Sequence, residues 1–340
     1  MEDRRHRLSW QTGLRPVWTA GDGCLPSLRP IFPMKKATLA ILLVTATARA
    51  WDAGGHMLVG QIAWELSSPQ VRSAVGEMVA TLDSRYNDGQ PYNFTTVSCW
   101  MDDLRALPKK EYPWSAWHYV DSEKTDDGKN FKLPEPPHVV WAIEENLKTL
   151  RNKQSPADER AKALGMLFHW VGDIHQPLHA TTWNDRGGNG YLVSGVHFSD
   201  LMPGMVGNLH TFWDKAFRFD VREGMVVELW ANPKIGERPK PGEGIIAEEA
   251  RDLMRRFPRA ALVELAQPGA QPGSAEAWAR ESHLIGCRSA YPPGPHPDNT
   301  EAPRLTPEFA HTSYEISGRR IVVAGYRLAA VLHELFDGKK

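Results

Sequence analysis

Cysteine is scarce in this chain of 340 residues, which has only Cys24, Cys99 and Cys287. So few cysteines exclude the small secreted domains that are held together by a disulfide framework. The sequence shows no internal repeat and no low-complexity tract, which excludes repeat arrays and biased segments. Its 41% hydrophobic and 24% charged residues are typical of a globular protein with one large core or two small domains.

A long hydrophobic run is also missing. The apolar stretch at residues 37–46 has half the roughly 20 residues that a transmembrane helix needs. It follows Lys35 and Lys36 and precedes Ala48-Arg49-Ala50, an order typical of a secretory signal peptide. We therefore predict that residues 34–50 are a signal peptide cleaved after Ala50, which makes Trp51 the first mature residue of a secreted or periplasmic protein. The alternative is a short buried core helix.

Residues 1–33 show no periodic pattern, and we treat them as an upstream extension outside the fold, with Met34 as a second possible start. Cys24 lies in this extension, which leaves Cys99 and Cys287 in the mature chain. In an oxidising compartment these two cysteines either pair or stay as separate buried thiols, and the sequence does not decide between the two.

An excess of positive charge is the third missing feature. The first 50 residues hold eight of the 40 basic and three of the 41 acidic side chains, so residues 51–340 have a formal charge of −6. A protein that binds nucleic acid by phosphate neutralisation alone is normally basic. Either nucleic acid is not the substrate, or bound metal ions supply the positive charge.

The mature sequence is dominated by helical patterns. Apolar residues with helical spacing predict helices around residues 58–66, 71–82, 143–150 and 321–335. Ser68-Pro69 is a typical helix start, and Ser155-Pro156-Ala157-Asp158 resembles a capping box for a helix that ends near Ile174. Residues 191–198 are the best candidate for a hairpin or long loop. We predict one all-α domain over residues 51–337 with long surface loops near 232–244, 267–273 and 292–303.

The residues most suited to chemistry are histidines and aspartates. His169 and Asp173 in the segment HWVGDIHQPLH are four residues apart, so a helix projects both from one face toward one metal ion. The pair His210 and Asp214 has the same spacing. Other candidates come from four further positions: His56, Asp102 or Asp103, His118 and His179.

Each of these candidates has an ordinary structural explanation when taken alone. A His/Asp pair on a helix is usually a surface pair, His118 among aromatic residues can be a core histidine, and Trp51 can be a packing residue. Their combination in a few short segments of a chain without a disulfide framework favours metal binding. Nitrogen and oxygen ligands without thiolates are typical of zinc.

These segments resemble the S1/P1 nuclease family, the zinc nucleases of the phospholipase C/P1 nuclease fold. The resemblance covers most of the mature chain and follows the family order. It rests on Trp51 with Gly55-His56 and on residues 98–105, 117–121, 169–179, 187–189 and 208–214, and less specifically on residues 278–285 and the last helix. Two features depart from the family pattern: Asp52 stands where a glycine is usual, and the loop between residues 188 and 208 is longer than in the fungal members.

The resemblance implies three zinc ions per chain. The first would be bound by Asp102, His118, His169 and Asp173. The second would be bound by Asp173, His56 and the α-amino nitrogen and carbonyl oxygen of Trp51, and the third by His179, His210 and Asp214. Trp51, Asp102 and Asp173 would therefore be the catalytic residues, with Asp173 bridging two ions. The family assigns no metal to His175, which we interpret as structural.

The implied activity is endonucleolytic hydrolysis of single-stranded DNA and RNA to 5′-nucleotides by a water shared between two zinc ions. Tyr119 would stack on an unpaired base, and Asp121 and Asn189 would hydrogen-bond it. Tyr119 as a core residue and Asp121 as a cap are the structural alternatives. No protein partner is implied, and no membrane anchor is left after signal cleavage.

Two other functions stay open at this point. A phospholipase C-like phosphodiesterase of the same fold would use nearly the same ligands, although no exposed membrane-binding stretch is evident. A non-catalytic secreted zinc-binding protein is the other, but sites with a shared carboxylate and three ligands favour catalysis over the closed four-ligand sites typical of structural zinc.

Overall fold

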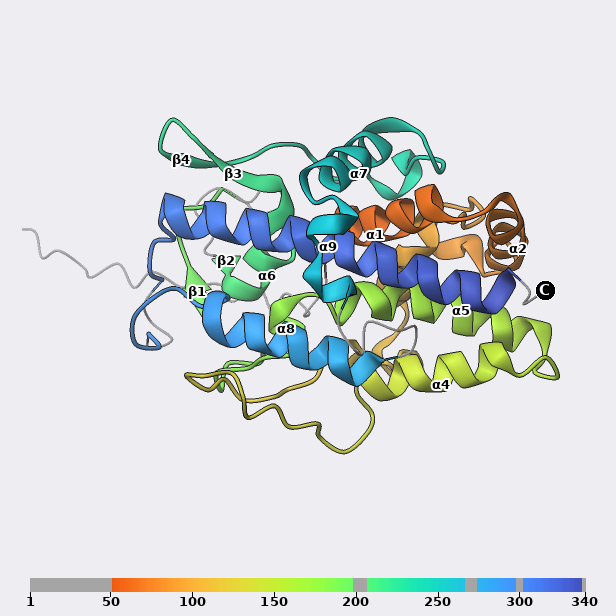
Figure 1. The fold of residues 1–340 in the computed structure, drawn as a ribbon, viewed down its shortest axis with the longest axis horizontal. Helices are drawn as coiled ribbons and strands as arrows, with labels where there is room; N and C mark the ends of the chain where they lie inside the picture. The colour runs from red at the N-terminus through yellow and green to blue at the C-terminus, as the bar shows by residue number, and fades with distance from the viewer. Residues whose placement is uncertain (1–50, 198–206, 267–273, 298–301, 338–340) are drawn as a thin grey trace, which may run out of the picture. The chain divides into compact units, whose positions relative to one another are not determined.

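The computed structural model describes residues 51–197, 207–266, 274–297 and 302–337, and this part of the chain is mainly helical (Figure 1). The prediction of one mainly helical domain is confirmed. The α-helices are α1 (Ala53–Leu66), α2 (Pro69–Val79), α3 (Trp100–Asp103), α4 (Val139–Arg151), α5 (Ala157–Asp173), α6 (Leu209–Trp213), α7 (Gly244–Arg256), α8 (Ala275–Ser289) and α9 (Pro307–Phe336). Short 3₁₀ turns connect several of them. No helix in the described ranges is both long and apolar enough to span a bilayer.

Helix α1 lies at the centre of the domain, where it packs against α5, α7 and α9 (Figure 1). Every residue from 54 to 63 is buried, so this helix has no solvent face along most of its length. The close approach of α9 depends on Gly325, because a Cβ there would lie 2.5 Å from Cγ2 of Ile62. The first metal-ligand candidate, His56, is therefore on a completely buried stretch of helix.

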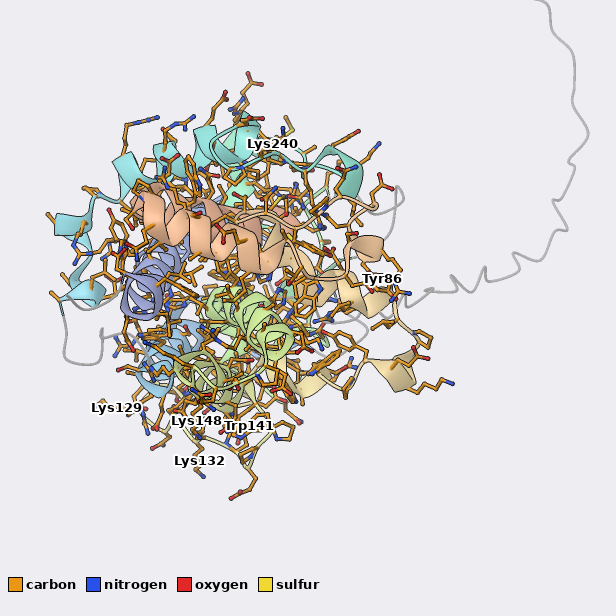
Figure 2. The ribbon with its side chains drawn as sticks, turned by 90° about the vertical axis from the view of Figure 1, so that its right-hand side faces the viewer. Tyr86, Lys129, Lys132, Trp141, Lys148 and Lys240 are labelled. Atoms are coloured by element: carbon orange, nitrogen blue, oxygen red, sulfur yellow. The ribbon has the colours of Figure 1, made fainter. Side chains whose placement is uncertain are left out.

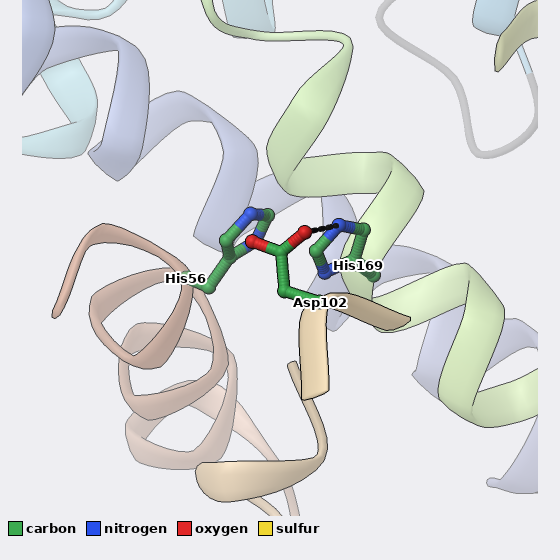
Figure 3. Close-up of side chains that lie close together, drawn as sticks. All are labelled: His56, Asp102 and His169. Carbon is green, nitrogen blue, oxygen red and sulfur yellow. Dashed lines mark ion pairs between the residues drawn. The ribbon is translucent and has the colours of Figure 1, made fainter. Parts of the chain in front are cut away.

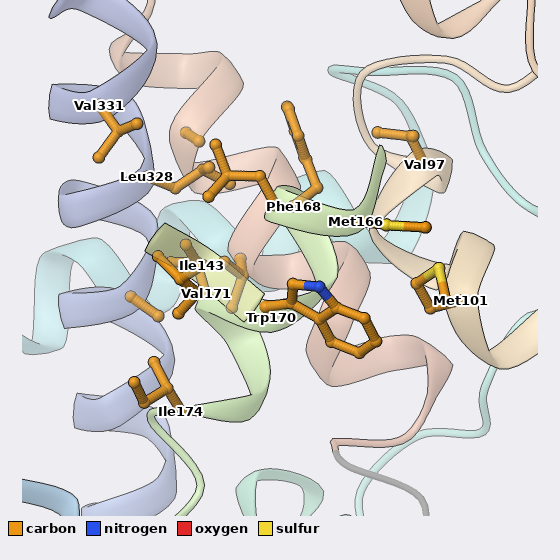
Figure 4. Packing of buried hydrophobic residues seen from close by; sticks show 14 of the residues in the cluster. Val97, Met101, Ile143, Met166, Phe168, Trp170, Val171, Ile174, Leu328 and Val331 are labelled. Atoms are coloured by element: carbon orange, nitrogen blue, oxygen red, sulfur yellow. The ribbon is translucent and has the colours of Figure 1, made fainter. Parts of the chain in front are cut away.

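The main hydrophobic core lies between α1, α4, α5 and α9, and Figure 4 shows part of it. Phe168 and Trp170 of α5 are completely buried there, together with Leu328 and Val331 of α9. Removing a buried aromatic side chain typically costs about 3–5 kcal/mol, so this packing fixes α5 firmly in place. A rigid α5 matters because two candidate ligands project from its last two turns.

The helix starts show which capping patterns act. The Ser68 side chain accepts a hydrogen bond from the Val71 N–H at the start of α2, as predicted. The predicted capping box at residue 155 is wrong: α5 begins at Ala157, its N-cap is Pro156, and no side chain caps it. The helix itself ends at Asp173, within one residue of the predicted end.

Two small antiparallel hairpins complete the fold. Strand β1 (Leu192–Val193) pairs with β2 (Gly207–Asn208), in the region predicted as a hairpin or loop; residues 198–206 of that loop lie outside the described residues. Strand β3 (Phe219–Arg222) pairs with β4 (Met225–Glu228), and this hairpin is not predicted from the sequence. Its two-residue turn has positive φ at Glu223 and at Gly224, the geometry that fits the twist of a hairpin.

Cys99 and Cys287 are both free and buried, so they do not form a disulfide with each other. Exposed lysines lie at the surface of the domain. Lys129, Lys132, Lys148 and Lys240, which Figure 2 labels, are among the exposed ones.

Candidate metal centre

Five candidate ligands from four different elements come together beneath the start of α1. His56 comes from α1, Asp102 from the short α3, and His118 from a 3₁₀ turn, Ser115–His118. His169 and Asp173 come from the last two turns of α5. All except Asp102 are fully or almost fully buried, and the Asp102 side chain is 13% exposed.

Asp173 lies between the histidines of this group. Its Oδ1 atom is 3.3 Å from Nε2 of His56, and its Oδ2 atom is 2.8 Å from Nδ1 of His118 and 3.4 Å from Nε2 of His169. The two carboxylate oxygens therefore face different histidines. This is the arrangement that a carboxylate needs in order to bridge two metal ions.

Figure 3 shows Asp102 between His56 and His169, with Oδ1 of Asp102 3.8 Å from Nε2 of His169. The rings of His56 and His169 are stacked with 4.0 Å between their centroids. Gly172 makes room for this stack, because a Cβ at that position would lie 2.7 Å from Nδ1 of His56. The lack of a side chain at Gly172 is thus what lets the His56 ring lie against the last turn of α5.

His56 has buried polar atoms that make no hydrogen bond within the described part of the protein. Both ring nitrogens are buried, and neither makes a hydrogen bond to any described residue. The Oδ1 atom of Asp173 is buried and unbonded in the same way. A buried polar atom without a partner costs about 1–3 kcal/mol, and a metal ion between these atoms would satisfy both. The residues present therefore fit a metal centre.

The other nitrogens of the histidines are held by hydrogen bonds that orient the rings. Nδ1 of His169 donates to the carbonyl of Ser98 at 2.7 Å, so Nε2 faces the site. His118 has the opposite orientation: its Nε2 is 2.6 Å from the hydroxyl of Tyr112, and its Nδ1 faces Asp173. Such partners fix the ring and the tautomer of a metal-binding histidine.

A second group lies nearby and contains His179, His210 and Asp214. Nε2 of His210 is 3.2 Å from Nε2 of His179 and 3.6 Å from Oδ1 of Asp214. Nδ1 of His179 donates to the carbonyl of His118, which ties this group to the first one. The amide of Gln176 donates to Oδ1 of Asp214 at 2.9 Å and orients that carboxylate.

Three sets of ligand atoms lie close enough to hold an ion each: His56, Asp102 and His169; His118, His169 and Asp173; and His179, His210 and Asp214. The third set is the one that the sequence predicts for one ion. The first two overlap at His169, whereas the sequence predicts that Asp173 is the shared ligand. The positions of the two Asp173 oxygens leave room for both groupings.

Burial shifts the pKa values of the ligand candidates toward neutral forms. It lowers the pKa of His56 and His118 well below the usual value, and it lowers that of His169 to about 4. Burial raises the pKa of Asp173 and Asp214 well above the usual range. Neutral histidines are ready to bind a metal, and an added cation is what restores the charge of the buried carboxylates.

Trp51 lies completely buried beside this group. Its indole Nε1 donates to the carbonyl of Gly172 at 2.9 Å, and its ring meets Phe217 edge to face. Gly55 permits this packing, since a Cβ there would lie 2.7 Å from Cβ of Trp51. The side chain of Trp51 is therefore fixed between the last turn of α5, the first turn of α1 and Phe217.

Two residues near the ligands have no role in the sequence-based prediction. Arg105 pairs with Oδ1 of Asp102 at 2.7 Å, its side chain is 16% exposed, and it lies over the ring of Tyr112. Tyr112 orients His118, as described above. Arg105 follows Asp102 by three residues on a helical turn, which is a signal that the sequence does contain.

Asp103 and His175 have structural partners. Asp103 accepts hydrogen bonds from Tyr92 and Arg238. His175 donates from Nδ1 to the carbonyl of Val171 and accepts from Arg327 at Nε2. Both residues are thus occupied away from the ligand atoms, in agreement with the structural role expected of His175.

The three predicted substrate-binding residues lie on segments that follow ligand candidates in the sequence: Tyr119 and Asp121 after His118, and Asn189 after His179. Tyr119 is half-buried and directly follows His118, and Asp121 is exposed two residues later. The strip that carries them runs beside the segment after His179, because Val120 N–H donates to the carbonyl of that histidine. Asn189 lies in the turn of residues 183–190, where its amide donates to the carbonyl of Arg186.

Fold and site together define a mainly helical protein with buried histidine–aspartate groups that can bind metal ions. The sequence model of the S1/P1 nuclease family matches residues 51–337. Endonuclease 3 of Arabidopsis thaliana is 25% identical over 316 residues, which cover 89% of this chain and 95% of the relative. Nuclease S1 of Aspergillus oryzae is 24% identical over 311 residues, covering 89% and 96%. Nuclease PA3 of a Penicillium species is 23% identical over 299 residues, covering 84% and 97%.

The chain belongs to the S1/P1 nuclease family. It is accordingly a nuclease, a hydrolase of nucleic acids.

Proposed function

We propose that this protein is a secreted endonuclease that binds three zinc ions and hydrolyses single-stranded DNA and RNA to 5′-nucleotides. The observation that carries the proposal is the set of buried ligand atoms around Asp173, where both His56 nitrogens and one Asp173 oxygen have no hydrogen-bond partner among the described residues. Family membership supports the nucleic acid substrate. Nitrogen and carboxylate ligands without thiolates support zinc.

Nine residues would hold the three ions. Asp102, His118, His169 and Asp173 would hold the first; His56, Asp173 and the backbone of Trp51 the second; and His179, His210 and Asp214 the third. Bound zinc supplies two things to phosphodiester hydrolysis: it lowers the pKa of coordinated water, and it neutralises phosphate charge.

The charge balance supports this assignment. Residues 51–340 have a formal charge of −6, which disfavours a phosphate substrate. Three divalent ions against the three ligand carboxylates would make the local potential positive, although the protein as a whole is acidic. The side chain of Arg105 adds a guanidinium at the edge of the first group, and guanidinium groups bind phosphate oxygens well.

The residues next to the ligands would select an unpaired base. Tyr119 is half-buried and adjacent to His118, so a base stacked on its ring would place the attached phosphate near the ligand groups. Asp121 and Asn189 offer hydrogen-bonding groups to the edge of that base. Bases in a duplex are already stacked and paired, so this arrangement favours single strands.

Processing would complete the second zinc site. The α-amino nitrogen of Trp51 can bind zinc only when it is a free amine, because the nitrogen of a peptide bond is not basic. Removal of residues 34–50 by cleavage after Ala50 would create that amine. Zinc loading would then follow export of the chain.

The test compares mature protein that begins at Trp51 with the same protein carrying an additional Gly-Ser before Trp51. We expect three zinc ions per chain in the mature protein by elemental analysis, one fewer in the extended protein, and much lower activity in the extended protein. Single-stranded DNA and RNA should be cut much faster than duplex, and phosphatidylcholine hardly at all. Full zinc content and activity in the extended protein would refute the role of Trp51, and equal rates on duplex and single strand would refute the base-selecting role.

A further inference from the structure

The residue after Trp51 is a buried aspartate whose polar groups are all engaged. Oδ1 of Asp52 accepts hydrogen bonds from the N–H groups of Gly54 and Gly55 and so caps α1. Oδ2 accepts from Nε of Arg218 at 3.0 Å, and the backbone N–H donates to the carbonyl of Asp214 at 3.0 Å. Asp52 therefore joins three separate parts of the fold within one residue of the predicted mature N-terminus.

Arg218 anchors this aspartate to the rest of the domain. Its side chain is 3% exposed, and besides Asp52 it pairs with Glu228 of strand β4 and donates to the carbonyl of Trp230. A buried guanidinium between two carboxylates is well compensated, whereas removing one partner of such a pair is strongly destabilising. The position of Asp52 is thus set by the hairpin β3–β4 and not by α1 alone.

These contacts determine where the α-amino group of Trp51 lies. The first residues of a chain are usually poorly ordered unless they are tied down. Here the indole of Trp51 is held by Gly172 and Phe217, which fixes Cβ, and Asp52 is held on both sides, which fixes the carbonyl carbon of Trp51. The hydrogen bond of the Asp52 N–H holds the planar peptide between Trp51 and Asp52, which also fixes Cα of Trp51. With Cα, Cβ and the carbonyl carbon in place, the chirality at Cα leaves one direction for the nitrogen.

We propose that Asp52 and Arg218 are positioning residues that aim the α-amino nitrogen and carbonyl oxygen of Trp51 at the second zinc site. This inference rests on the proposed ligand role of Trp51. It adds that the free amine is not enough: the amine must also be aimed, and the Asp52–Arg218 pair does this. The hydrogen bond from Asp52 to the carbonyl of Asp214 links the same anchor to the third zinc site.

The experiment measures zinc affinity in mature proteins that begin at Trp51, by competition with a chelator. The variants are Asp52→Gly, which removes cap and ion pair, and Asp52→Asn, which keeps an oxygen for the cap but not the charge facing Arg218. Ser68→Gly is the matched control, because the Ser68 side chain caps α2 in the same way and is remote from the ligands in sequence.

We expect Asp52→Gly to bind one zinc ion about 10–100-fold more weakly, the usual effect of losing a residue that orients a ligand, and to keep the other two ions. Asp52→Asn should show a smaller loss in the same ion, which keeps the test valid if the glycine variant folds poorly. Ser68→Gly, which also loses an N-cap side chain, should bind all three ions as the unmodified protein does.

Unchanged zinc affinity in both Asp52 variants would overturn the inference, and so would an equal loss in Ser68→Gly. The Gly-Ser extended protein separates this failure from failure of the proposed function. If the extended protein loses one zinc ion while the Asp52 variants lose none, Trp51 is a ligand and the positioning role is wrong. If the extended protein keeps all three ions, Trp51 is not a ligand and the proposed function fails at that point.

Discussion

Replacing Gly172 by alanine sets helix propensity against the packing of the metal centre. Gly172 is in the last turn of α5, and in an ordinary helix the change to alanine is favourable by up to about 1 kcal/mol. Here the new Cβ would lie 2.7 Å from Nδ1 and 3.1 Å from Cε1 of His56, and 3.7 Å from Cδ1 of Trp51. These distances decide the sign of the effect.

The His56 ring has little room to retreat, because it is completely buried and stacked on His169. Overpacking of this kind usually costs about 1–3 kcal/mol. After subtraction of the gain in helix propensity, we expect Gly172→Ala to lower the free energy of unfolding by about 1 kcal/mol. The displaced ring should also weaken binding of one zinc ion, by about 10–100-fold if the effect is that of a disturbed ligand orientation.

The assay is urea unfolding of the zinc-free protein, together with zinc affinity measured by chelator competition. Gly76→Ala is the matched control: Gly76 lies inside α2, and a Cβ there would meet no atom within 4 Å. We expect this control to raise the free energy of unfolding by up to about 1 kcal/mol and to leave zinc binding unchanged. The free energies of unfolding of the two variants should therefore change in opposite directions and differ from each other by about 2 kcal/mol.

A result in which Gly172→Ala is stabilised as much as Gly76→Ala and binds zinc normally would refute this reasoning. It would mean that His56 and Trp51 move aside at no cost, and that glycine at position 172 is not a condition for the site.

Three other predictions follow from single contacts. Gln176→Leu should lower the affinity for one zinc ion, because it removes the hydrogen bond that orients Asp214. Titration with a chelator should show that the other two ions stay bound. His138 caps α4 with a neutral Nδ1, and burial lowers its pKa, so its folded form resists protonation. As the pH falls below about 6.5, the unfolded state takes up this proton before the folded state does, so the free energy of unfolding should fall by up to about 1.4 kcal/mol per pH unit relative to His138→Asn. Urea unfolding at pH 7.5 and 5.5 measures this difference, and equal pH dependence of the two proteins would contradict the prediction. Burial raises the pKa of the Cys99 thiol to about 12, so a thiol reagent should label Cys99 only after denaturation; rapid labelling of the native protein would show that this part of the core opens.

The sequence predicts the site best where local spacing is sufficient. His169 with Asp173, and His210 with Asp214, are separated by one helical turn, so their proximity can be predicted without a fold. The contacts of His56 with Asp173 and of Tyr112 with His118 join residues far apart along the chain or in different turns. No local period encodes these contacts. The grouping of the ligands is therefore predicted only from the family resemblance, and the orienting role of Tyr112 is seen only in the three-dimensional structure.

The fold has the same division between local and distant information. Ser68 followed by Pro69 predicts the start of α2 correctly, because a side-chain cap and a proline both act within one turn. The similar pattern at Ser155 fails because Pro156 itself takes the N-cap position and no side chain caps α5. Hairpin β3–β4 is missed because Glu223-Gly224 is a less distinctive turn than Asn-Gly, although its glycine has the expected positive φ. Helix α9 begins at Pro307, well before the predicted stripe, because its first turns pack against the β3 region.

The enclosed position of α1 means that the packing around it is incomplete until the C-terminal helix has been made. Helix α1 is the first of the described helices to be synthesised, and α9, one of the helices that bury it, is the last. Until α9 has been made, the face of α1 that packs against α9 is uncovered, and His56 is part of α1. A nascent or C-terminally truncated chain would contain every candidate ligand, since the last of them is Asp214, and would still lack the packing that holds His56 in place. The segment that carries the candidate ligands, which ends at Asp214, therefore depends on a helix that follows it in the sequence, α9.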